Sequence, residues 1–206
     1  MDEPFLPPQG FRPDPRELIL ASSSPRRRQL LEHWGYRFRV IEPDPSAECG
    51  TCSRETPPEL VARLAYQKGA NVIQKIDDGW VVACDTVAEC QGRILGKPAD
   101  RDHARHMLEQ LRGREHRVYS GLCLWEKKTS HRSVQVDVST LRMESISDAE
   151  LEAFLDTDGW IGKAGALGFQ DGPRWIELLS GSPTNVVGLP MEQLAKLLVT
   201  HAVRIA

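Results

Sequence analysis

An apolar run that leads into a serine-rich turn and a proline-started helix is the feature that most constrains this chain. Residues 18–20 form the run, Leu-Ile-Leu, and predict a buried strand. Ser24 suits the N-cap of the helix that follows, and Pro25 suits its first position. Leu30, Leu31 and Trp34 then share one helical face. A strand joined by a tight turn to an amphipathic helix is typical of α/β proteins.

The same turn carries groups that suit an anion. Three hydroxyls, at Ser22 to Ser24, lie beside the unpaired N–H groups and positive dipole end of the helix, and Arg26, Arg27 and Arg28 follow. These groups predict a phosphate site, in which we expect Ser22, Ser24, Arg26 and Arg27 to take part. The alternative is a capped surface helix whose arginines are simply solvated.

A second basic residue lies in the helix predicted to begin at the capping box Thr56-Pro-Pro-Glu59. Lys68 falls in register with its apolar stripe, four residues after Leu64. A lysine in that position either extends to solvent along the helix end or points into a cleft and meets an anion. The sequence by itself leaves both open.

An acidic residue follows the apolar run Trp80-Val-Val-Ala-Cys, which predicts a strand covered on both faces. Asp85-Thr86 could be turn chemistry. However, Gln91-Gly92 resembles a hairpin tip, so the strand is expected to continue past Thr86 and return to bring Lys97 near the level of Asp85. An aspartate inside a strand favours a functional role for Asp85.

The C-terminal half alternates between helical and strand patterns. Helices are predicted from Asp100 to Leu111, after the capping box at Ser147, and from Pro190; strands are predicted at 118–125, 134–141 and 175–179. Between them, Gly159 to Gly172 is rich in glycine and allows close approach to a ligand, with Lys163 and Gln170 as its polar members. The predicted fold class is α/β with a mixed sheet.

Composition limits the class of protein. The 206 residues carry a net charge of −3, which argues against a general nucleic-acid surface. No apolar run approaches the roughly 20 residues of a membrane helix, and the N-terminus does not resemble a signal peptide, so a cytoplasmic protein without membrane partners is expected. Five cysteines fit reduced thiols, and Cys49 and Cys52 are more simply an incidental loop pair than half a zinc site or a redox pair.

Together these groups predict a polyphosphate site. The turn around Arg27, with Lys68 and Lys97, can neutralise several negative charges. The alternating residues 36–41 predict a second strand, and Glu48 lies in the proline-rich loop that follows it. Asp85 and Glu48 can supply oxygen ligands for a divalent cation such as Mg²⁺ or Mn²⁺.

The chain resembles the Maf family of nucleoside triphosphate pyrophosphatases over residues 18–198. The matching blocks are Leu20-Ala-Ser-Ser-Ser-Pro-Arg-Arg27, Arg63-Leu-Ala-Tyr-Gln-Lys68, Asp85-Thr-Val87, Gly96-Lys-Pro98, Lys163-Ala-Gly165 with Gln170, and Thr184-Asn-Val-Val-Gly-Leu-Pro190. The resemblance implies an elongated twisted sheet with a cleft between two lobes, similar to the inosine triphosphate pyrophosphatases. It also implies metal-assisted cleavage of a nucleoside triphosphate to monophosphate and pyrophosphate, with Asp85 activating water. The expected layout is a proline-rich tail over 1–16, one domain over 17–200 and a C-terminal tail over 201–206, and a homodimer is left open.

Within that family, Arg26, Thr86 and Gln170 correspond to positions that distinguish branches. Thr86 with Gln170 resembles the branch acting on dTTP and UTP, whereas a 7-methyl-GTP branch tends to carry Gln and Glu there. The chain departs from the dTTP/UTP pattern at Cys84, Leu167, Asp171 and Pro183, of which Leu167 and Pro183 replace aromatic residues. The resemblance to proteins linked with arrest of septation leaves open an alternative, a nucleotide-binding regulatory module with little hydrolysis.

Overall fold

A computed structural model describes residues 5–48, 55–170 and 174–203, with only the backbone at positions 48, 202 and 203. Its centre is one seven-stranded mixed sheet in the order β2-β1-β3-β5-β6-β7, with β4 paired to β3 beside this path. The strands are β1 (Leu18–Ala21), β2 (Phe38–Val40), β3 (Trp80–Cys90), β4 (Arg93–Leu95), β5 (Glu115–Glu126), β6 (Arg132–Met143) and β7 (Ile176–Ser180). The α-helices are α1 (Pro25–His33), α2 (Pro57–Ile73), α3 (Arg101–Leu111), α4 (Asp148–Leu155), α5 (Pro183–Val187) and α6 (Met191–Val203), and short 3₁₀ turns are η2 (Pro45–Glu48) and η3 (Ala164–Ala166).

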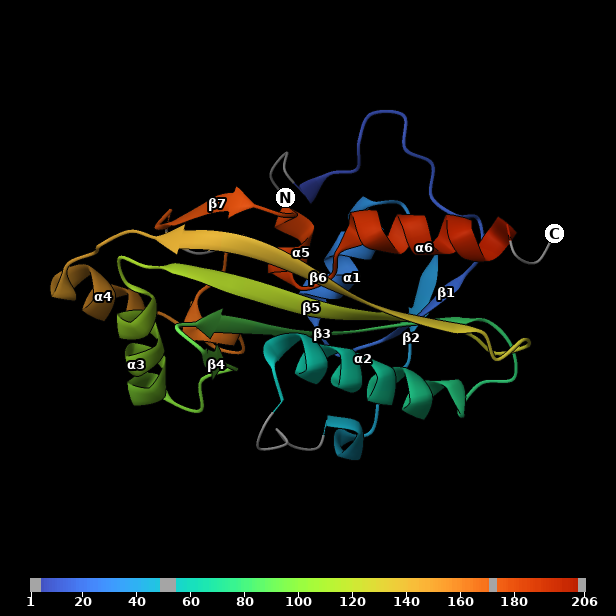
Figure 1. Ribbon diagram of the computed structural model, residues 1–206, viewed down its shortest axis with the longest axis horizontal. Helices are drawn as coiled ribbons and strands as arrows, with labels where there is room; N and C mark the ends of the chain where they lie inside the picture. The colour runs from blue at the N-terminus through green and yellow to red at the C-terminus, as the bar shows by residue number, and fades with distance from the viewer. Residues whose placement is uncertain (1–4, 49–54, 171–173, 204–206) are drawn as a thin grey trace.

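Helices cover both faces of this sheet (Figure 1). Helix α2 lies along one face, which we call the α2 face, while α1, α5 and α6 lie on the opposite one. Strands β1, β2 and β3 run parallel, and β3, β5, β6 and β7 are antiparallel neighbours. The predicted mixed α/β class is confirmed, and β5 and β6 are longer than their alternating patterns indicated.

The side-chain alternation of β3 divides the core between the two faces. Val81 and Ala83 pack against α2, whereas Val82 and Cys84 face α1 and α6. Further along that second face, Ala88 belongs to a separate cluster built on α3 and α4. Two apolar clusters therefore lie end to end on one face of the sheet, which is the two-lobed arrangement that the family resemblance implied.

Strand β3 changes neighbours along one of its edges. Residues 80–83 pair with β1, and residues 88–90 pair with β4. Among the strands that the structure describes, none pairs with this edge between Cys84 and Val87, while β5 continues along the other edge. The gap contains Asp85 and Thr86, whose side chains point to opposite faces of the sheet. Asp85, in the middle of β3, therefore lies at a break in the sheet.

The helix signals in the sequence were largely accurate. The capping boxes at Thr56 and Ser147 and the cap at Asp100 begin α2, α4 and α3 as predicted. Helix α5 was not predicted: Ser182 caps it and Pro183 opens it, but it is only five residues long. No helix of the described chain combines the length and apolarity needed to cross a bilayer.

The two terminal segments, predicted as tails, pack against the domain. In the predicted arm over 1–16, Phe5 is buried and the ring of Phe11 packs edge-on against Trp34. At the other end, α6 continues to Val203, past the expected boundary at residue 200, and His201 is buried against Trp80.

Candidate active site

A cavity of about 520 Å³ lies at the gap in the sheet. It is lined from the β1–α1 turn, the middle of β3, the segment after β4, the glycine-rich loop and the end of α5. Ten predicted site residues line it: Ser22, Ser24, Arg26, Arg27, Lys68, Asp85, Thr86, Lys97, Lys163 and Gln170. Arg28 is exposed and is absent from this wall, and the side chain of Glu48 lies outside the described residues, as do Cys49, Cys52 and Asp171.

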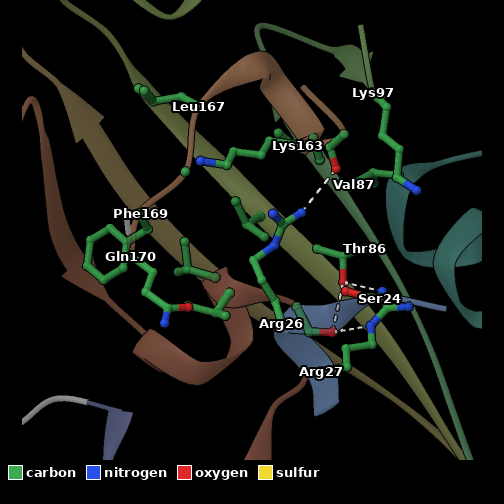
Figure 2. A pocket seen from close by; sticks show the side chains of 18 of the residues that line it. Ser24, Arg26, Arg27, Thr86, Val87, Lys97, Lys163, Leu167, Phe169 and Gln170 are labelled. Atoms are coloured by element: carbon green, nitrogen blue, oxygen red, sulfur yellow. Dashed lines mark hydrogen bonds between the residues drawn. The ribbon is translucent and has the colours of Figure 1, made fainter. Parts of the chain in front are cut away.

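Arg27 joins three elements at the pocket floor (Figure 2). Its guanidinium donates to the carbonyl of Gly188 at 2.7 Å, to Ser22 Oγ at 3.0 Å and to Thr86 Oγ1 at 3.3 Å. The hydroxyl of Thr86 also lies 2.8 Å from Ser120 Oγ. Arg27 is buried, and its hydrogen bonds fix the guanidinium in position. Its charge is therefore already placed at the cavity before a ligand binds.

The β1–α1 turn presents further donors to the same cavity. Ser24 is the N-cap residue of α1, but its side chain makes no capping bond, so its hydroxyl is not used to hold the helix. Arg26 Nη2 donates to the carbonyl of Gly162 at 3.0 Å and so ties the turn to the glycine-rich loop (Figure 2). The predicted phosphate-binding turn therefore faces the pocket from a helix N-terminus.

Lys68 points inward rather than to solvent. It comes from α2, is buried, and its Nζ lies 2.6 Å from Asp85 Oδ1. This pair forms on the α2 face of the gap, while Arg27 and Thr86 meet on the other. Of the two interpretations of Lys68, the cleft is therefore confirmed, and an acidic and a basic side chain lie side by side in the pocket wall.

The glycine-rich loop brings a third buried cation. Lys163 is buried, and a Cβ at Gly168 would lie 2.5 Å from its ammonium nitrogen, so a larger residue there would have to displace the end of the lysine side chain. The N–H of Gly165 donates to the carbonyl of Gly96 at 3.0 Å, which fixes the loop beside the segment that carries Lys97. Lys97 itself is exposed at the mouth of the cavity.

Gln170 has an unused acceptor. Its Oε1 is buried and has no hydrogen-bond partner within the described part of the chain. A buried carboxamide oxygen without a partner is costly unless a ligand supplies the donor. The position lies at the end of the cavity lined by apolar residues, which suits a flat nucleobase more than a phosphate chain.

The two aromatic residues that line the cavity were not predicted from the sequence. Phe169 lines the cavity next to Gln170 (Figure 2) and supplies an aromatic side chain near Leu167, whereas Pro183 does not line it. His116 also lines the wall, and burial lowers its pKa, so it is neutral at physiological pH. The only sequence signal for Phe169 was its place between a glycine and Gln170 in the glycine-rich loop. His116 gave no signal, because it lies within an alternating strand pattern.

The described residues contain no group of three or more His, Cys, Asp or Glu side chains placed to form a metal cage. Asp85 nevertheless offers a carboxylate at the cavity wall. Mg²⁺ commonly binds through one or two carboxylates together with substrate phosphates, and Asp85 fits that mode. A cation held in this way would be ordered largely by the phosphates it arrives with.

A sheet interrupted at a mid-strand aspartate, with five cationic side chains around one cavity, defines a site for handling a phosphorylated ligand. The model of the Maf family, described as Maf-like protein, matches residues 17–201. The chain belongs to this family.

Curated relatives match nearly the whole chain. A dTTP/UTP pyrophosphatase of Rhodopirellula baltica is 55% identical, over 94% of this chain and 85% of its own length. Proteins of the same name from Pelotomaculum thermopropionicum and Carboxydothermus hydrogenoformans are 39% and 38% identical, over 89% and 86% of this chain and 95% of their own lengths.

Proposed function

We propose that this protein hydrolyses dTTP and UTP to the nucleoside monophosphate and pyrophosphate. The observation that carries the proposal is the convergence of Asp85, five cationic side chains and the Gln170 carboxamide, whose oxygen has no partner among the described residues, on one cavity. The names of the relatives support the same activity. A nucleotide-binding regulatory module is not favoured, because a site that only bound the ligand would have no need of a base among its phosphate-binding groups.

In the proposed reaction, water attacks the α-phosphorus. Asp85 accepts the proton of that water as the new P–O bond forms, and the bond to the bridging oxygen breaks to release pyrophosphate. Lys68 holds the Asp85 carboxylate in place through the 2.6 Å contact. Arg26, Arg27 and Lys97 neutralise the charge on the phosphates, and Lys163 adds a buried positive charge nearby.

The proposed cofactor is Mg²⁺ or Mn²⁺, bound by Asp85 and substrate oxygens, with Glu48 as a second carboxylate from the η2 segment. When bound, such a cation stabilises negative charge on the phosphates. The α1 turn would meanwhile orient the phosphate chain through Ser22, Ser24 and the helix N-terminus.

Base selection is assigned to Gln170 and its neighbours. Its Oε1 can accept from N3–H of thymine or uracil, and its amide can donate to O4 of the same edge. The ring of Phe169 offers an apolar surface beside it. The proposed cellular location is the cytoplasm, where nucleotides are abundant and where the free thiols of Cys84, Cys90 and Cys123 stay reduced.

The proposal is tested by measuring pyrophosphate release from ordinary, deoxy and modified nucleoside triphosphates with Mg²⁺ and with Mn²⁺. We expect dTTP and UTP to have the highest kcat/KM. Gln170→Glu should erode that preference by about tenfold, because a carboxylate cannot donate to O4. Preference for 7-methyl-GTP or for another purine nucleotide in the parent enzyme would refute the assignment of the base.

Lys97→Ala should lower kcat/KM by about tenfold or more while leaving the melting temperature unchanged, because an exposed lysine at the pocket mouth contributes to ligand binding and little to folding. Lys128→Ala is the matched control: this lysine is exposed and paired with Asp78, and it does not line the cavity. Lys68→Ala should also impair turnover, and unchanged kinetics in both Lys97→Ala and Lys68→Ala would exclude them as phosphate-binding groups.

A further inference from the structure

The N-terminal arm, residues 5–16, runs along the side of the sheet that carries α1, α5 and α6 (Figure 1). Phe5 is 3% exposed, and its ring meets the ring of Phe169 edge-on, with the two centroids 6.0 Å apart and the planes at 83°. Phe169 in turn lines the cavity beside Gln170 (Figure 2). Phe5 itself does not line the cavity, so the arm supports the pocket wall from behind.

Further contacts hold the arm against the domain. The indole N–H of Trp34, at the end of α1, donates to the carbonyl of Phe5 at 2.9 Å. Phe11 packs against the same indole, with ring centroids 4.8 Å apart. Closer to β1, the guanidinium of Arg16 lies 4.3 Å over the ring of Trp80. Because the arm is held at several points along its length, Phe5 is kept against Phe169.

The glycine-rich loop depends on such contacts for its shape. Gly162 and Gly165 have φ angles of 67° and 68°, which glycine adopts readily and which leave the loop backbone free to take other conformations. The hydrogen bonds from Arg26 to Gly162 and from Gly165 to Gly96 hold the first half of the loop. In its second half, Phe169 packs against the apolar clusters of both lobes. The ring of Phe5 belongs to the first of these clusters.

The orientation of Phe169 matters because this residue carries the only phenyl ring among the described residues that line the cavity. Leu167 offers no aromatic surface, so stacking on a nucleobase depends on that ring. Phe169 is half-buried on a loop, and fixing its ring at the moment of binding costs conformational entropy. A second ring packed edge-on against it lowers that cost before the ligand arrives.

We propose that Phe5 is a positioning residue for the base pocket: it orients the ring of Phe169 so that the pyrimidine base of the nucleotide stacks on it. This assignment rests on the proposed function. It concerns the base and not the phosphates, because the cationic side chains that face the phosphates come from other segments. The arm is thus a working part of the binding site and not only a cover for the core.

Isothermal titration calorimetry with two probes tests the proposal. One probe is the α,β-imido analogue of dUTP, which has the base but resists cleavage at the α-phosphorus; the other is inorganic triphosphate, which has no base. Phe5→Ala should raise the Kd of the imido analogue by about fivefold and change that of triphosphate by less than about twofold. Equal weakening of both probes would mean general damage to the fold and overturns the proposal, as does a parent that binds both probes equally well.

A double-mutant cycle tests whether Phe5 acts through Phe169. Phe169→Ala should raise the Kd of the imido analogue by about tenfold, and adding Phe5→Ala to it should change the Kd no further. Effects that multiply in the double variant overturn the proposal. Leu197→Ala is the matched control: Leu197 is buried in the same apolar cluster as Phe5 and does not line the cavity, so this variant should lower the melting temperature and leave the Kd unchanged.

These binding constants do not depend on turnover. A parent that binds the imido analogue but fails to hydrolyse dTTP and UTP refutes the proposed function, and the role of Phe5 is still decided by the two probes. A parent that hydrolyses both nucleotides while Phe5→Ala binds the analogue as tightly as the parent refutes the role of Phe5 alone.

Discussion

Asp85→Asn is expected to lower turnover of dTTP and UTP by about 100- to 10,000-fold, the range that general-base catalysis contributes. The amide has the shape of the carboxylate, and its oxygen can still accept a hydrogen bond from Lys68, so α2 stays joined to β3. It cannot accept the proton of the attacking water, and it is a poor ligand for a divalent cation.

The measurement is single-turnover pyrophosphate release with the enzyme in excess and saturating, so that a binding defect is separated from a chemical one. Circular dichroism should match the parent. Asp156→Asn removes the same charge at an exposed position paired with Arg101 and should retain full activity. If Asp85→Asn hydrolysed the nucleotides at a near-normal rate, the proposed role of Asp85 as the base would be wrong.

The sequence predicted the parts of the site that depend on local pattern. Ser24 and Pro25 mark the start of α1 in the sequence as in the structure, and the hairpin at Gln91-Gly92 returns Lys97 toward Asp85. These features follow from capping and turn chemistry, in which a few neighbouring residues determine the backbone. The ten pocket residues could be named because each belongs to such a local signal or to a family motif.

What could not be predicted depends on contacts between distant segments. No local pattern states that Arg27 donates to the carbonyl of Gly188, 161 positions further along the chain. The direction of Lys68 was ambiguous because the helical stripe fixes a face but does not say whether an acidic partner lies beneath it. The aromatic anchors of the arm, Phe5 and Phe11, were missed because its proline content indicated an extended segment but not where it docks.

The gap in the sheet is the clearest case of a feature set by topology. A continuous apolar strand through Asp85 was predictable, but not that β1 ends at Ala21 while β4 begins to pair only at Ala88. The break leaves the Asp85 backbone without a neighbour on one edge and gives its side chain access to the cavity. The position of Asp85, the proposed base, is thus defined by where two other strands stop.

Gly121 is directly opposite Asp85 in the pairing of β5 with β3, and it controls how closely α2 approaches the sheet. A Cβ at this position would overlap the backbone carbonyl of Val61 and lie 2.8 Å from the backbone nitrogen of Ala62. Both atoms belong to the backbone of a long helix, so they cannot yield as a flexible side chain can. The helix must therefore shift to accommodate any larger residue.

Gly121→Ala is accordingly expected to destabilise the protein by about 3 kcal/mol or more, at the upper end of overpacking effects. It should also lower kcat/KM, because a displaced α2 withdraws Lys68 from the 2.6 Å contact with Asp85.

Gly69→Ala is the matched control on the other side of the same interface, where the new methyl group meets the Cys123 side chain at 3.1 Å. That sulfur can move, and alanine is the better helix former by about 1 kcal/mol, so Gly69→Ala should stay within about 1 kcal/mol of the parent. Urea denaturation followed by circular dichroism measures both variants. Parental stability in Gly121→Ala would mean that α2 does not rest on the β5 backbone, and that the spacing between Lys68 and Asp85 is set by some other contact.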